Sequence, residues 1–163
     1  MKNRMMIGLG VISIASIALT GVAHAQTMRV PYSNALTLDM AKKCVALAEA
    51  ESKKNNWNMA IAVVDDGGHL VAFSKMDNTQ IASIRIAIEK AKTANNARRP
   101  SKALEDALAG GRMAILGLPG LTPLEGGLPL VSDGKIMGAV GVSGELGGQD
   151  AQAAKACVDN LGK

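Results

Sequence analysis

Histidine and cysteine, the side chains that most often serve as bases, nucleophiles and metal ligands, are scarce in this sequence. Its 163 residues include two histidines, His24 and His69, and two cysteines, Cys44 and Cys157. No Cys-x-x-Cys or His-x-x-x-His pair occurs, whereas a closed zinc site requires four such ligands. The sequence therefore predicts no zinc-type metal site.

The two cysteines fall in the first and the last of the helices that the hydrophobic spacing predicts. If those helices lie side by side in an oxidising compartment, Cys44 and Cys157 can form a disulfide. The alternative is that both thiols are buried and act as small hydrophobic side chains. The sequence leaves both interpretations open.

A serine between glycines, Ser143 in a Gly-Val-Ser-Gly segment, resembles the nucleophile elbow of hydrolases. That motif requires a glycine two positions after the serine, and Glu145 stands there instead. A catalytic triad would also have to recruit His69. The glycines more simply indicate a strand end where two backbones approach closely, so we predict no catalytic residue.

Four residues could contact a ligand. His69 follows a predicted turn and is either an exposed turn residue or a contact to a flat iron-bearing macrocycle. Met76 is either a soft metal ligand or a side chain that fills a gap in the core. Thr122 lies in a Gly- and Pro-rich loop and offers an oxygen to iron or to its own backbone. Arg98 ends a helix, where it either binds carboxylates or complements the helix dipole.

These side chains must be positioned by elements that the hydrophobic spacing predicts. Apolar residues at helical spacing indicate helices, and short apolar runs joined by Gly-containing turns indicate hairpins. Thr37 occupies the N-cap position of the first helix. The expected elements are a helix over 36–54, strands over 59–64 and 69–73, helices over 77–96 and 100–110, a long loop over 116–127, strands over 128–131 and 136–142, and a helix over 150–161.

This order of elements predicts the fold class. Strands linked by hairpins form an antiparallel sheet, which makes the protein α+β and not doubly wound α/β. We expect about four to five strands flanked by helices, in the order helix, two strands, two helices, two strands, helix. No internal repeat or linker divides the segment, so residues 26–163 are predicted to form a single domain.

Residues 1–25 have the layout of an export signal. Lys2 and Arg4 precede a short apolar run, and small residues surround His24, where cleavage is expected. The run is shorter than the roughly 20 residues of a membrane-spanning helix. We therefore expect a periplasmic or secreted protein that is not stably inserted in a membrane after cleavage.

Charge and aromatic content argue against a nucleic-acid partner. The formal net charge is +4, and half of it comes from Lys2 and Arg4 in the predicted signal. Only three residues are Phe, Trp or Tyr, which is too few for a platform on which bases stack. The sequence predicts no nucleic-acid binding.

Several motifs taken together resemble the GlcG/HbpS-type haem-binding family, and in particular its exported branch. The similarity covers about residues 36–161. The motifs are the first hairpin over 62–72, Met76-Asp77 with the helix that follows, 90–94, 126–129, 138–144, and Asp150 at the start of the last helix.

The resemblance implies an α+β domain that binds haem and often assembles into homo-oligomers. Members of the family are associated with haem binding, haem breakdown, iron sequestration and partnership with a sensor kinase. This sequence departs from the pattern at Asn78 and Glu145, where glycines are frequent, and it has no histidine in the first helix. Asn accepts left-handed backbone geometry, and the missing imidazole implies oxygen-based or weak iron ligation.

Two main hypotheses follow. The first is an exported, oligomeric haem-binding protein that sequesters or senses haem under the Gly-Pro loop, with His69 or Thr122 at the iron and Arg98 facing the propionates. The second is a ligand-free oligomeric accessory protein that binds a sensor partner. A further alternative is an enzyme of haem degradation or of small hydroxy-acid metabolism, for which His69 is the one identifiable general base.

Overall fold

The computed structural model describes residues 36–162. The predicted export signal, residues 1–25, lies outside the described residues. The elements follow the predicted order, with one short 3₁₀-helix (η1) added. They are α1 Leu38–Lys54, β1 Ala60–Asp65, β2 Leu70–Lys75, α2 Ala82–Ala97, α3 Lys102–Ala109, η1 Met113–Gly117, β3 Gly127–Ser132, β4 Lys135–Ser143 and α4 Gly147–Asn160.

The four strands form one antiparallel sheet in the order β2-β1-β4-β3. Each predicted hairpin supplies two neighbouring strands, β1 with β2 and β3 with β4. The hairpins join through β1 and β4, which pair from Ala60 opposite Ser143 to Asp65 opposite Gly138. The α+β class and the strand count are therefore confirmed.

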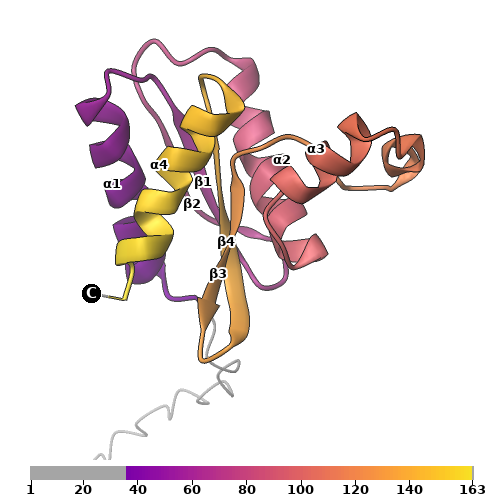
Figure 1. Ribbon diagram of the computed structural model, residues 1–163. Helices are drawn as coiled ribbons and strands as arrows, with labels where there is room; N and C mark the ends of the chain where they lie inside the picture. The colour runs from indigo at the N-terminus through magenta and orange to yellow at the C-terminus, as the bar shows by residue number, and fades with distance from the viewer. Residues whose placement is uncertain (1–35, 163) are drawn as a thin grey trace, which may run out of the picture. The chain divides into compact units, whose positions relative to one another are not determined.

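Helices cover both faces of the sheet (Figure 1). Helices α1 and α4 lie side by side on one face, and α2 packs on the other. Helix α3 and the loop that contains η1 lie on the α2 side. Among the residues that the structure describes, none of the helices has both the length and the apolar character of a membrane span.

The first residues of β1 differ in size between the two faces of the sheet. Successive residues of a strand point to opposite faces, and Ile61 and Val63 pack into the core with α1 and α4. The alternating residues Ala60 and Ala62 pack instead against Ala87 of α2. Because these two side chains are small, the backbone of α2 can approach this part of the sheet closely.

Replacing Gly141 by alanine is expected to lower the free energy of unfolding by about 1–3 kcal/mol, since overpacking forces backbone shifts. A Cβ at Gly141 would collide with the Ala87 oxygen and the Ala91 nitrogen. Both atoms belong to the α2 backbone, so the helix would have to move away from β4. Urea unfolding of the variant would measure the loss.

The matched control is Gly148→Ala, in the first turn of α4. A Cβ there meets nothing within 4 Å, and alanine favours the helix by roughly 0.5–1 kcal/mol. We expect this variant to be as stable as the parent or slightly more stable. Equal losses at Gly141 and Gly148 would contradict a close contact between α2 and β4.

Helix α2 begins later than predicted, at Ala82 and not near Asp77. Asn78 takes a left-handed φ of 61°, which interrupts a right-handed helix. The Thr79 hydroxyl donates to the carbonyls of Met59 and Met76 and holds this segment as a turn beside β1. Helix α4 begins three residues before Asp150, at Gly147.

Candidate functional site

Three of the four predicted ligand-contacting residues line three different cavities of the described region: Thr122, Arg98 and Met76. Thr122 lies in a cavity of about 340 Å³ beside the first half of α2. Arg98 lies in one of about 490 Å³ at the other end of that helix. Met76 borders a third, of about 350 Å³, next to α1. The structure does not bring the predicted residues together.

The loop cavity is the hollow between α2 and the loop that follows η1. It is lined by Ala82, Arg85, Ile86, Glu89 and Thr122. The position of the loop is set by a hydrogen bond of 2.8 Å, in which the Thr122 backbone N–H donates to the hydroxyl of the fully buried Thr93. Farther along, the Ser101 hydroxyl donates to the Leu124 carbonyl at 2.6 Å.

The loop cavity combines an apolar wall with charged groups. Ala82 and Ile86 lie one turn apart on α2 and form the wall, while Arg85 and Glu89 flank it on the same helix. The Glu89 carboxylate also accepts from Lys92 at 3.1 Å. Large apolar side chains that neighbour these residues in the sequence are exposed: Ile81, Leu118 and Leu124.

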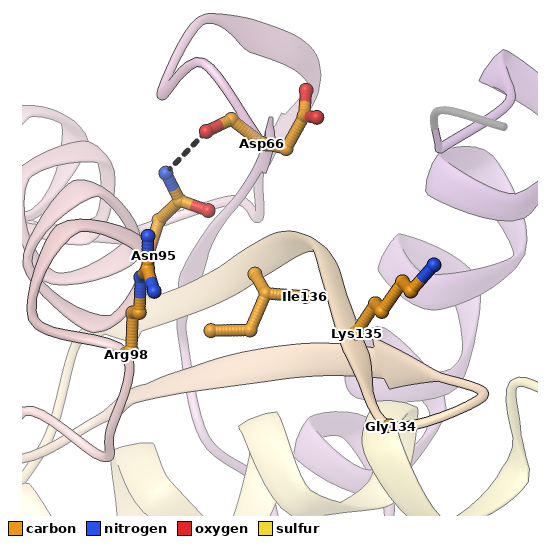
Figure 2. A pocket seen from close by; sticks show the side chains of 6 residues that line it. All are labelled: Asp66, Asn95, Arg98, Gly134, Lys135 and Ile136. Atoms are coloured by element: carbon orange, nitrogen blue, oxygen red, sulfur yellow. Dashed lines mark hydrogen bonds between the residues drawn. The ribbon is translucent and has the colours of Figure 1, made fainter. Parts of the chain in front are cut away.

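The turn cavity is the hollow at the opposite end of α2, where that helix meets the β1–β2 and β3–β4 turns (Figure 2). The residues that line it are Asp66, Asn95, Arg98, Gly134, Lys135 and Ile136. One hydrogen bond, from Asn95 Nδ2 to the Asp66 carbonyl at 2.9 Å, joins the helix to the first turn. Polar and charged side chains dominate this cavity.

His69 and Met76 lie outside both of these cavities. The His69 side chain is 83% exposed, and its Nδ1 lies 3.4 Å from an Asp65 carboxylate oxygen, which agrees with its interpretation as an exposed turn residue. Met76 packs against the core that contains α1, as a gap-filling methionine does. Their roles as ligand contacts remain predictions.

Thr122 and Arg98 line different cavities, although the Thr122 backbone N–H bonds to Thr93, which lies only five positions before Arg98. The basic residue that lines the loop cavity together with Thr122 is Arg85, which the sequence did not single out.

Sequence reasoning also missed a buried ion pair behind the loop cavity. Lys90 of α2 donates to an Asp150 carboxylate oxygen at 2.6 Å and to the Val142 carbonyl at 3.1 Å. Both side chains are almost completely buried, at 4% and 2% exposure. Burial raises the pKa of Asp150, and the hydrogen bond and charge of Lys90 act against that rise.

The helices on the other face of the sheet are joined covalently. Cys44 of α1 and Cys157 of α4 form a disulfide with their Cα atoms 4.7 Å apart. Both residues are fully buried. Of the two interpretations that the sequence left open, the structure has the disulfide.

Taken together, the fold and its cavities define a class: an α+β domain whose sheet is covered on one face by a disulfide-linked helix pair and on the other by a helix with a ligand-sized cavity at each end. Residues 36–159 match the family described as haem degrading protein HbpS-like. The chain belongs to this family.

Individual relatives agree with that assignment. Protein GlcG of Escherichia coli K12 is 50% identical over 108 residues, which is 66% of this chain and 81% of GlcG. A crystal structure of HbpS superimposes with a TM-score of 0.76 at 30% identity, over 83% of this chain and 96% of HbpS. A crystal structure of a PduOC–haem complex shares the fold, with a TM-score of 0.70 at 22% identity over 77% and 94% of the two chains.

Proposed function

We propose that the protein binds haem in the loop cavity. The family to which the chain belongs is described by haem degradation, and PduOC, which shares the fold, was crystallised as a haem complex. The observation that carries the proposal is the composition of the loop cavity, an apolar wall beside Arg85 and Thr122. Small-molecule sites typically combine apolar walls with a few polar groups that fix orientation.

The residues of the loop cavity fit the chemistry of haem. Haem has broad apolar faces and two propionate carboxylates at one edge. Ala82 and Ile86 offer an apolar surface, and the exposed guanidinium of Arg85 can bind a propionate with two hydrogen bonds. Thr122 and Glu89 offer oxygen atoms, whereas His69, the one histidine in the described region, lies at the far end of α2.

The chain's own residues would hold and orient haem, and haem would supply the redox-active iron. The loop cavity is shielded on one side by the segment that the Thr122–Thr93 hydrogen bond keeps in place. The arrangement supports binding of haem, with oxygen-based ligation, more directly than it supports breakdown of the ring. We therefore propose sequestration or sensing of haem.

We further propose that the protein works outside the cytoplasm. A disulfide such as Cys44–Cys157 persists in oxidising compartments such as the periplasm. This agrees with the expectation that residues 1–25 are an export signal.

Titration of the purified protein with haem tests the proposal through the Soret band. We expect saturable binding that Ile86→Glu weakens at least tenfold, because it places a charge against an apolar ligand face. Arg85→Gln should weaken binding severalfold by removing the propionate partner. Lys135→Gln, which removes an equal charge at the other end of α2, is the matched control and should bind haem as the parent does.

Two outcomes would overturn this site. If His69→Ala abolishes the Soret change and Ile86→Glu does not, haem binds at the opposite end of α2. If no saturable change in the Soret band occurs at all, the ligand-free alternative is supported instead.

The ligand-free alternative is favoured by the exposed side chains of Ile81 and Leu146, at 84% and 76% exposure. A hydrogen bond from Gln80 to the Gly144 carbonyl joins their segments, which gives a homo-oligomer or a sensor partner an apolar surface to cover.

A further inference from the structure

We propose that the turn cavity is a second ligand site, one that binds a small organic carboxylate bearing hydroxyl groups. This goes beyond haem binding, since the turn cavity shares no residue with the loop cavity. The inference starts from one buried atom whose hydrogen-bonding capacity is not used.

That atom is the side-chain oxygen of Asn95. The residue is only 6% exposed. Its Nδ2 donates to the Asp66 carbonyl at 2.9 Å and toward Asn96 Oδ1 at 3.3 Å. Because both neighbours are acceptors, the amide cannot be turned over without losing these bonds. Oδ1 therefore points the other way, and it has no hydrogen-bond partner within the described residues.

The Asn95 oxygen is directed into the turn cavity. Figure 2 shows it pointing away from Asp66, to the side where Ile136 lies. Buried carbonyl oxygens in proteins are nearly always paired, and an unpaired one calls for an explanation. The polar neighbours of this oxygen indicate what kind of ligand would pair with it.

Two cations and one anion surround the same cavity. The Arg98 side chain runs alongside Asn95, whereas Lys135 extends from the rim of the cavity (Figure 2). The carboxylate of Asp66 points away from Asn95, whose bond is to the Asp66 backbone. The Asn95 oxygen is itself buried, so a ligand reaches it only when neighbouring side chains move, and the adjacent Arg98 is exposed.

Arg98 also occupies an unusual backbone position. It caps the C-terminus of α2 with a left-handed φ of 54°, a conformation in which glycine is the usual residue. An arginine side chain is therefore placed over the turn cavity at some cost in backbone strain.

These groups define the ligand. A guanidinium is always charged and binds carboxylates through two parallel hydrogen bonds. A carboxylate only accepts hydrogen bonds, so it cannot pair with Asn95 Oδ1, which also only accepts. The ligand must therefore carry a hydrogen-bond donor in addition to its carboxylate, and a hydroxyl group can donate to Asn95 Oδ1. A cavity of about 490 Å³ is within the usual range for small-molecule sites.

Isothermal titration calorimetry with gluconate tests the site on the whole protein. Gluconate has a carboxylate and hydroxyls, hexanoate has only the carboxylate, and sorbitol has only the hydroxyls. We expect gluconate to bind at least tenfold more tightly than either analogue. Arg98→Gln should weaken gluconate binding about tenfold, and Asp66→Asn should tighten it severalfold by removing the one anion.

Lys155→Gln is the matched control, because it removes one positive charge from the exposed face of α4. It should bind gluconate as the parent does. No saturable heat with gluconate, or equal weakening by Arg98→Gln and Lys155→Gln, would overturn the site. If hexanoate binds as tightly as gluconate, the Asn95 oxygen does not accept a hydrogen bond from a ligand hydroxyl. Haem titration of Arg98→Gln should match the parent, which separates this proposal from the loop cavity.

Discussion

Replacing Lys90 by methionine is expected to lower the free energy of unfolding at pH 7 by about 3–5 kcal/mol, because it leaves a buried carboxylate without its counter-charge. The Lys90 ammonium lies 2.6 Å from the Asp150 carboxylate, and both side chains are at most 4% exposed. Methionine fills a similar volume but cannot donate to Asp150 or to the Val142 carbonyl. Urea unfolding would measure the loss.

The loss should depend on pH in a definite direction. Burial already raises the pKa of Asp150, and Lys90 opposes that rise, so removing Lys90 raises the pKa further. A carboxyl whose pKa is raised in the folded state contributes its stability fully below its unfolded pKa, about 3.9. That contribution is lost as the pH rises through the folded pKa. The deficit of Lys90→Met should therefore be small near pH 4 and grow toward pH 7.

Two further variants separate the buried pair from a general loss of charge. Lys92→Met removes a half-exposed partner of Glu89 on the same helix, and such pairs contribute only about 0–1 kcal/mol. Lys90→Met combined with Asp150→Asn should recover much of the single-variant loss, since no charge is then buried. A pH-independent loss, or one no larger than that of Lys92→Met, would show that the pair is not coupled as described.

Loss of the Cys44–Cys157 disulfide is expected to cost about 2–5 kcal/mol, and toward the upper end of that range. The bond spans 113 positions, and closing a long loop removes more entropy from the unfolded chain than closing a short one. The variant Cys44→Ala/Cys157→Ala should therefore unfold at a markedly lower urea concentration. Equilibrium unfolding under oxidising conditions gives the difference.

The two single variants provide an internal control. Either substitution alone removes the cross-link, so each should lose nearly as much stability as the double variant. A reducing agent should lower the stability of the parent protein to about that of the double variant, which should itself be insensitive to it. Additive losses from the two single variants would mean that packing of the sulfur atoms, and not the cross-link, supplies the stability.

Most of the fold could be predicted because its signals are local. Gly-containing turns marked both hairpins, and apolar spacing marked α1, α2 and α4. Asn78 stands where the family often has glycine, and asparagine is expected to accept a left-handed backbone there. The φ of 61° at Asn78 agrees with this expectation. The late start of α2 was not anticipated, because it depends on the bond from Thr79 to Met59, which lies across the fold.

The candidate sites were predicted only in part, for a similar reason. Thr122 was singled out by its irregular loop, and it does line a cavity. Arg98 was assigned to the same site, since the spacing of residues along a chain does not show which end of a helix faces which loop. Lys90 and Asn95 gave a signal that was overlooked, as both fall on the buried stripe of α2 with Ala87 and Ala91. Their partners are distant in sequence.

The cross-link between α1 and α4 has a mechanical consequence. Cys44 lies near the beginning of the described domain and Cys157 near its end, so nearly every strand and helix lies within one covalent ring. Tension applied to the two tails would pass through the sulfur bridge and leave the sheet unloaded. A protease that cut the loop after η1 would likewise open the ring without releasing a fragment.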